Sequence, residues 1–300
     1  MAELILHHYD ISPYAEKIRL IMGLKRLAWR SVHIPVVMPK PDLTALTGGY
    51  RLTPVLQIGA DIYCDTRTIA RRLERERPTP SLFPPAAAAT NRGLTFWGET
   101  LFMDLVAIGF GMGAFPPDFV ADRQKLVPGG INEAAIRAVV PSKTDEVRAK
   151  LTLIEAQLAD GRTFLLGEQP SLADLAVYHP LWALRTFPAS QPLFAQCRAV
   201  PAWMAKVAAF GHGTPSPLDS ADAVDIARNA QPTTEAFVDT GELTGRKVGD
   251  RIRVFPEPYG RDPVEGDLVY ADAHEIALRR TDPRTGDVVV HFPREGYVVL

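Results

Sequence analysis

The chain has 300 residues, of which 46% are hydrophobic and 23% charged, a balance typical of a globular protein with a full core. Its 33 basic and 35 acidic residues give a net charge of -2, which excludes the electrostatic footprint of a nucleic-acid-binding protein. Two cysteines exclude a disulfide framework, the N-terminus does not have the pattern of a signal peptide, and no apolar run approaches the roughly 18 residues that span a membrane. We therefore expect a cytoplasmic protein that binds neither nucleic acid nor membrane.

The first 80 residues alternate short apolar runs with helical patterns. Ser12 is a good N-cap and Pro13 follows at the first helical position, where the N–H that proline lacks would have no partner. Gly59-Ala60 separates two apolar runs, which indicates a hairpin. The pattern predicts strands over residues 3–8, 29–34, 54–58 and 61–64, and helices from Ser12 and over residues 66–77.

The middle of the chain is helical in pattern. Prolines between residues 78 and 85 mark a linker, and Ser171 with Asp174 three residues later resembles a capping box at a helix start. Glycines at 109, 111 and 113 are expected to interrupt the first long helix. The predicted helices cover residues 86–108, 144–158, a stretch from Ser171, and 201–210.

The last part of the chain has a different residue pattern. After a second linker at residues 211–217 and a possible short helix over 221–230, strand-like runs occupy residues 251–255, 275–279 and 288–292, with turn clusters at 257–260, 265–267 and 282–287. This spacing is typical of a small antiparallel barrel or sandwich. We therefore expect three units: residues 1–80, an all-helical unit over 86–212, and a β module over 235–300.

Four local motifs, in this order, resemble the cytosolic glutathione transferases. They are Ser12-Pro13-Tyr14 with Lys17, Leu52-Thr53-Pro54-Val55-Leu56, Asp65-Thr66, and Phe164-Leu165-Leu166-Gly167 with Ser171-Leu172-Ala173-Asp174. The resemblance covers residues 1 to 212 and is to the bacterial type with Ser-Pro-Tyr at its first helix. It implies a thioredoxin-like glutathione-binding domain, an all-α domain, a homodimer, and glutathione as co-substrate for attack on a small electrophile. The β module has no counterpart in the ordinary family.

Ser12 is the candidate for stabilising the bound thiolate. A free thiol has a pKa near 8.5, and lowering it by about 2 units requires about 2.7 kcal/mol of preference for the anion. A hydroxyl donor together with a helix N-terminus supplies energy of that order. Two alternatives stay open: Ser12 as a plain N-cap, and Tyr14 as the competing donor. A serine here argues against disulfide reductase chemistry, which prefers cysteine.

The remaining candidate residues suit the two ends of glutathione. The resemblance implies a cis Thr53-Pro54 bond, which would leave the backbone groups of Thr53 free for the ligand's peptide backbone. Asp65 could meet the ammonium of the γ-glutamyl group and Thr66 its carboxylate at a helix N-terminus, although capping alone also explains both. Lys40 could reach the glycine carboxylate, or be an exposed loop lysine.

Other residues give weaker signals. His7 and His8 end the first strand without further recognisable ligands, so no metal site is expected. Phe102, Phe110 and two nearby methionines, Met103 and Met112, could line an electrophile pocket or simply pack in the core. Two hypotheses follow: an enzyme that conjugates glutathione, or a non-catalytic binding or scaffold protein of the same fold that uses its β module for partner contacts.

Overall fold

The N-terminal domain has the predicted βαβ–ββα order. We analysed a computed structural model that describes residues 3–127, 129–257 and 259–300. Ser12 caps the first helix as expected, because its Oγ accepts a hydrogen bond from the Ala15 N–H at 3.2 Å. The domain consists of β1 (Ile5–His8), α1 (Pro13–Leu24), β2 (Ala28–His33), α2 (Pro41–Thr47), β3 (Val55–Ile58), β4 (Asp61–Cys64) and α3 (Thr66–Glu76).

The helical domain follows and differs from the prediction in four places. α4 continues through Gly109, α6 begins at Glu133 with Pro141 inside it, and neither α5 nor α8 was anticipated. Gly111 helps to explain why α4 is longer than predicted. A Cβ at this position would lie 2.2 Å from Val140 Cγ2, so the glycine permits close packing of α4 and α6 and does not end α4 early. The helices are α4 (Ala88–Gly111), α5 (Pro117–Gln124), α6 (Glu133–Leu158), α7 (Leu172–Leu184), α8 (Gln191–Ala195) and α9 (Ala199–Ala208), with 3-10 turns at Pro85–Ala87 and Pro188–Ser190.

One helical stretch, Pro85–Gly111, is long and apolar enough to cross a membrane by length and composition. In this structure its α4 part packs against α6 and α7 inside the helical domain. A helix in the core of a folded domain meets the same criteria, so the stretch is weak evidence for a membrane span.

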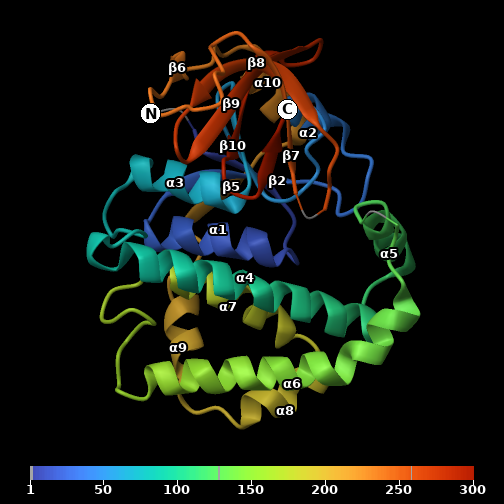
Figure 1. Ribbon diagram of the computed structural model, residues 1–300, viewed down its shortest axis with the longest axis vertical. Helices are drawn as coiled ribbons and strands as arrows, with labels where there is room; N and C mark the ends of the chain where they lie inside the picture. The colour runs from blue at the N-terminus through green and yellow to red at the C-terminus, as the bar shows by residue number, and fades with distance from the viewer. Residues whose placement is uncertain (1–2, 128, 258) are drawn as a thin grey trace.

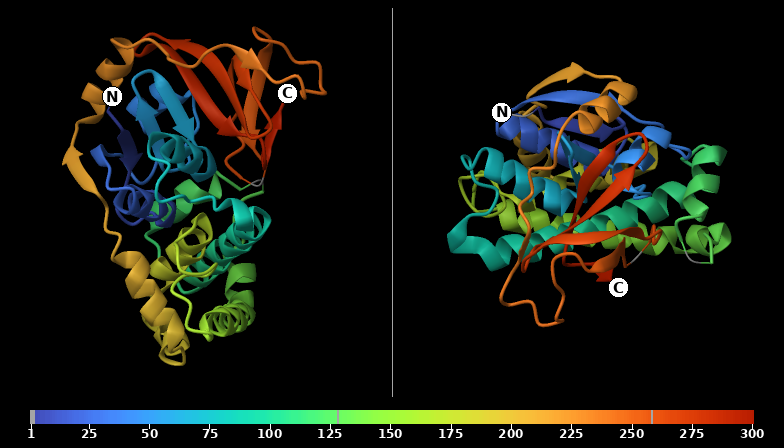
Figure 2. Two further views of the ribbon diagram at one scale, coloured as in Figure 1. Left: turned by 90° about the vertical axis from the view of Figure 1, so that its left-hand side faces the viewer. Right: turned by 90° about the horizontal axis from the view of Figure 1, so that it is seen from above.

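The C-terminal segment wraps around the N-terminal domain. β5 (Thr214–Pro217) forms within the expected linker and pairs parallel with β2, and α10 (Ser220–Arg228) packs against α2. The chain then crosses to the opposite edge of the sheet, so the blue N-terminal strands lie between β5 and the red C-terminal strands (Figure 2, left). The remaining strands are β6 (Phe237–Val238), β7 (Arg251–Pro256), β8 (Val264–Ala271), β9 (Glu275–Asp282), β10 (Gly286–Pro293) and β11 (Tyr297–Val299).

The expected antiparallel module is present, but it continues the N-terminal sheet instead of closing into a separate barrel. β10 pairs parallel with β4, in the register Val289 to Asp61, so the described strands form one sheet with the order β11-β7-β8-β9-β10-β4-β3-β1-β2-β5 and β6 beside β8 (Figure 1). The physical reason is that β4 would otherwise be a bare edge with unpaired backbone groups. Pairing with β10 covers it.

The prediction of a turn at residues 265–267 is wrong, because these residues lie inside β8. The prediction rested on Gly266. A Cβ on it would lie 2.3 Å from the Arg279 carbonyl oxygen, so the glycine is needed where β9 approaches closely and does not mark a turn.

Two hydrophobic cores hold the molecule together. One joins α1, α3 and one face of the sheet to the helical domain, with Ile18, Leu56 and Trp203 among its members. The other joins the opposite face to α2, α10 and the β module, and contains Cys64 and Phe292. The β module therefore shares a core with the N-terminal domain, which fixes its strands beside the predicted site.

Candidate active site

Ser12 lies at the start of α1, buried to 3% exposure. Its Oγ accepts the Ala15 N–H, and its own N–H donates to the Tyr9 carbonyl at 3.2 Å. Accepting a hydrogen bond leaves the hydroxyl hydrogen able to donate elsewhere. The capping interpretation therefore holds, and the role of Ser12 as a thiolate donor stays a prediction.

The Tyr14 ring packs against neighbouring side chains. Its ring lies 4.7 Å from those of Phe102 and His179, centroid to centroid. Burial raises the pKa of Tyr14 well above its usual value, and Tyr259 and Glu99 add to the rise. His179 is itself fully buried, and neither of its ring nitrogens has a hydrogen-bond partner among the described residues. The arrangement favours packing for Tyr14 over a direct role with the thiol.

The Thr53-Pro54 peptide bond is cis, as the resemblance implied, and Pro54 is buried at the start of β3. Lys40 lies beside it, with Nζ 3.4 Å from Thr53 Oγ1 and 5.3 Å from the centre of the Tyr9 ring. Lys40 is only 4% exposed, so the alternative of an exposed loop lysine is wrong. The formation of α2 directly after it, which the sequence did not indicate, explains the burial.

Lys40 belongs to a cluster with more positive than negative charge. Arg51 pairs with Asp122 at 2.7 Å, and Arg123 pairs with the same carboxylate while its Nη2 donates to the Tyr9 hydroxyl at 3.2 Å. Burial, together with the nearby Arg123, lowers the pKa of Lys40 to about 8, and Asp122 opposes this shift. Three cations therefore share one carboxylate here. A site of this kind suits an anionic ligand group.

Asp65 caps α3 from the left-handed region, with φ 72°. Its carboxylate accepts the Arg67 N–H at 2.8 Å, the Arg67 Nε and Nη2 groups at 3.0 Å each, and the Tyr297 hydroxyl at 3.2 Å. Burial opposes ionisation, but Arg67 holds the pKa of Asp65 below its usual range. Asp65 is therefore charged and already well supplied with donors from this chain.

Thr66, the first residue of α3, is buried. Its Oγ1 accepts a hydrogen bond from Lys17 Nζ at 3.3 Å, and Lys17 also lies 3.4 Å from Glu99 Oε1 on α4. Both contacts are long for charge-assisted bonds, and burial lowers the pKa of Lys17 against the pull of Glu99 and Asp65. Lys17 is thus a second positively charged residue of the predicted site, next to Thr66, and its contacts with the surrounding residues are long.

Tyr259, from the β module, also reaches this part of the site. Burial raises the pKa of Tyr259 to about 12, and the charges of Asp65 and Glu99 add to the rise. The next residue, Gly260, donates its N–H to the Leu126 carbonyl just beyond α5 at 3.0 Å. Tyr259 is therefore surrounded by residues of both the N-terminal and the helical domain.

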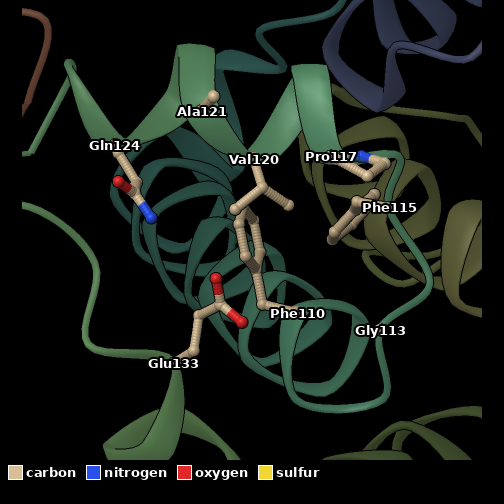
Figure 3. A pocket seen from close by; sticks show the side chains of 8 residues that line it. All are labelled: Phe110, Gly113, Phe115, Pro117, Val120, Ala121, Gln124 and Glu133. Atoms are coloured by element: carbon tan, nitrogen blue, oxygen red, sulfur yellow. The ribbon is translucent and has the colours of Figure 1, made fainter.

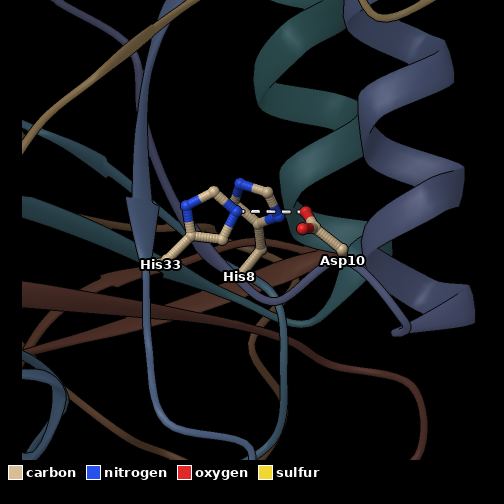
Figure 4. A group of neighbouring side chains, drawn as sticks. All are labelled: His8, Asp10 and His33. Carbon is tan, nitrogen blue, oxygen red and sulfur yellow. Dashed lines mark hydrogen bonds and ion pairs between the residues drawn. The ribbon is translucent and has the colours of Figure 1, made fainter.

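His8, Asp10 and His33 form a group whose ligand atoms lie within 4.8 Å of one another (Figure 4). His33 Nε2 is 3.0 Å from Asp10 Oδ1. Both nitrogens of His8 are engaged, Nδ1 with Arg19 at 3.1 Å and Nε2 with Ser31 at 2.8 Å. A metal ion would have to break one of these bonds to gain a ligand, so the geometry does not favour a metal site.

A cavity of about 310 Å³ lies between the end of α4, α5 and the start of α6 (Figure 3). Among the candidate pocket residues only Phe110 lines it, alongside Phe115 and Val120. Phe102 packs on Tyr14 instead, and Met103 and Met112 are 54% and 42% exposed. A second cavity, lined by Asp239, Glu242 and Arg294 among others, belongs to the β module.

Comparison with known proteins identifies the family. Residues 6–81 match the glutathione S-transferase N-terminal domain and residues 133–206 its C-terminal domain. The crystal structure of a GST-like protein from Pseudomonas syringae is 41% identical, with 99% of this chain and 100% of that one covered and a TM-score of 0.80. The chain belongs to the glutathione S-transferase family.

Two further proteins are similar over a smaller share of this chain. FtsZ-localized protein A of Caulobacter vibrioides is 28% identical over 180 residues, which cover 58% of this chain and 74% of that protein. A glutathione S-transferase of Methylobacillus flagellatus, solved with glutathione bound, is 22% identical, covers 71% of this chain and 100% of its own, and has a TM-score of 0.56. The last likeness shows the fold alone.

Several residues around the site could not be found from the sequence. Arg51 and Arg123 carried no motif, and Tyr297 lies in a strand too short to stand out. Tyr259 was noted only as part of a turn cluster, and its neighbour Pro258 lies outside the described residues. The local pattern shows that a turn is present, but not where its side chain points.

Proposed function

We propose that this protein binds glutathione between Lys40 and Asp65 and stabilises its thiolate for attack on a small electrophile. The cluster of Lys40, Arg51 and Arg123 beside the cis Thr53-Pro54 bond carries the proposal. These three cations share one carboxylate, and the glycine carboxylate of glutathione is an anion that would balance them. A cis bond at Thr53 leaves its backbone groups for the cysteinyl peptide unit, as in strand addition.

The proposed chemistry needs few groups. The Ser12 hydroxyl donates to the glutathione sulfur, and the N-terminus of α1 adds its partial positive charge, so the thiol proton leaves to solvent at neutral pH. The thiolate then forms a carbon–sulfur bond with the electrophile. In an aromatic substitution the leaving chloride departs with the electron pair of its bond. Such a protein would be a cytoplasmic homodimer, as is usual in the family.

Turnover of 1-chloro-2,4-dinitrobenzene with glutathione tests the proposal. Loss of about 2 kcal/mol of thiolate stabilisation in Ser12→Ala should lower kcat/KM about 30-fold at pH 6.5, and less at pH 9, where free glutathione ionises unaided. Tyr14→Phe is the matched control and should keep most of the rate, because Tyr14 is packed against Phe102 and His179. Equal rates for wild type and Ser12→Ala would remove Ser12 from the chemistry.

A second candidate function, that of a non-catalytic binding or scaffold protein, is tested separately. The similarity to FtsZ-localized protein A and the presence of the β module favour a non-catalytic binding or scaffold protein. Calorimetry separates the two functions. Heat from glutathione binding that disappears in Lys40→Met supports the glutathione site, whereas no binding at millimolar ligand favours the scaffold.

A further inference from the structure

The β module supplies side chains to the part of the site where the γ-glutamyl group of glutathione would bind. We propose that Tyr259 and Tyr297 are affinity-determining residues that occupy this end of the site, so that glutathione must compete with the protein's own side chains. The inference rests on the proposed function and adds to it. It concerns the stretch of the chain beyond the two matched transferase domains, which end at residue 206.

The first observation is the full set of donors around Asp65. A carboxylate offers about four lone-pair positions. Three hydrogen bonds from Arg67 and one from Tyr297 use that number. The ammonium of a γ-glutamyl group can reach Asp65 only by displacing a donor. The Tyr297 bond, at 3.2 Å, is the longest of the four and comes from a neutral group, so it is the weakest competitor.

The second observation is the path of the chain around Tyr259. Gly260 has φ 68° and its N–H is bonded to the Leu126 carbonyl. A Cβ on Gly260 would lie 3.2 Å from the Leu52 side chain, next to the cis-proline loop, and 3.5 Å from that of Leu126. The backbone at Gly260 therefore passes between the N-terminal domain and the residue that follows α5. Tyr259, the residue before Gly260, is therefore held close to both domains.

The third observation is the burial of the residues that glutathione must touch. Thr66 is 5% exposed and Lys17 is fully buried. Tyr259 precedes Gly260, whose backbone passes between Leu52 and Leu126, and the charges of Asp65 and Glu99 act on the Tyr259 hydroxyl. The strands of the module are fixed by the pairing of β10 with β4, whereas Tyr259 and Gly260 lie outside any strand. A change in the position of the Tyr259 side chain would therefore break no strand pairing of the module.

Labelling of a cysteine at position 66 tests the cover without glutathione. In Thr66→Cys with Cys197→Ser, Lys17 favours the thiolate, so a small thiol reagent reports access to this position. Adding Tyr259→Ala should raise the labelling rate about tenfold or more, in proportion to the open fraction of the site. Tyr270→Ala is the matched control, because Tyr270 belongs to the same module but bonds Asp272. Cys64 is fully buried, and its labelling would reveal unfolding.

Calorimetry with glutathione completes the test on the otherwise unchanged protein. Tyr259→Ala should lower the Kd about tenfold, because a covered site weakens the apparent affinity by the fraction that is open. If the alanine variant fails to fold, Tyr259→Leu removes the ring while keeping an apolar side chain, and the same fall in Kd is expected. A Kd that rises in Tyr259→Ala, or equal labelling rates, overturns the inference and leaves the proposed function standing. If Tyr259→Ala speeds labelling but no variant binds glutathione, the proposed function is overturned. The inferred competition between glutathione and Tyr259 is then overturned as well.

Discussion

The Tyr297 hydroxyl of β11 lies 3.2 Å from Oδ2 of Asp65, the cap of α3. This bond joins one of the last residues of the chain to a residue of the N-terminal domain. The same hydroxyl is 3.2 Å from that of Tyr50, and the Arg67 guanidinium lies 5.9 Å from the centre of the Tyr297 ring. The position of Asp65 is therefore linked to the docking of the β module.

Tyr297→Phe should tighten glutathione binding. The substitution removes one donor from Asp65 and leaves the packing of the ring in place, so the ligand ammonium no longer competes with it. One neutral hydrogen bond contributes about 1 kcal/mol, which corresponds to roughly a fivefold lower Kd and to a similar loss of unfolding free energy. Calorimetry and urea unfolding measure the two effects. Tyr270→Phe is the control, and weaker binding in Tyr297→Phe would mean that Tyr297 supports the ligand.

The charge of Lys40 should make glutathione binding pH-dependent. Burial lowers the pKa of Lys40 to about 8, so the free protein loses this proton as the pH rises through 8. Pairing with a carboxylate requires the charged form, and the Kd should then rise by up to about tenfold per pH unit. Calorimetry with S-methylglutathione, which has no thiol to titrate, measures this from pH 6.5 to 9. Lys40→Arg keeps the charge and should flatten the curve, while parallel curves would exclude Lys40.

The sequence predicted features that depend on neighbouring residues and missed those set by distant packing. The Ser12 cap and the Gly59-Ala60 hairpin follow from local chemistry, and both form. The burial of Lys40 depends on α2 and on Arg123, which lies far away in the chain. Likewise, the β module that contains Tyr259 is placed by the pairing of β10 with β4, which no local pattern reveals.

Asp174 should be a stability residue. Its carboxylate accepts hydrogen bonds from the Leu165 N–H at 2.8 Å, the Ser171 N–H at 2.9 Å and the Trp203 indole at 3.0 Å, all buried. Asp174→Ala leaves these donors without partners and should lower the unfolding free energy by about 3 kcal/mol. Urea unfolding measures the loss. Asp160→Ala, at an exposed turn, is the control, and similar losses in both variants would contradict the role of the buried network.

His291 should make the docking of the β module weaken at high pH. Its Nδ1 is 2.7 Å from Glu275 Oε1 and its Nε2 is 3.5 Å from Asp61 Oδ1, across the seam of β10 with β9 and β4. Burial opposes the charge, but hydrogen bonds to Asp61 and Glu275 raise the pKa of His291 above 6.5. The stabilisation is thus complete below pH 6.5 and is lost as the pH rises through the folded-state pKa.

Urea unfolding between pH 6 and 9, with amide exchange of Val290 on β10, should show this decline. His291→Gln should be less stable at pH 6 by on the order of 3 kcal/mol and lack the slope, whereas exposed His274→Gln should keep it. Parallel pH curves for wild type and His291→Gln would show that the seam is held by packing alone.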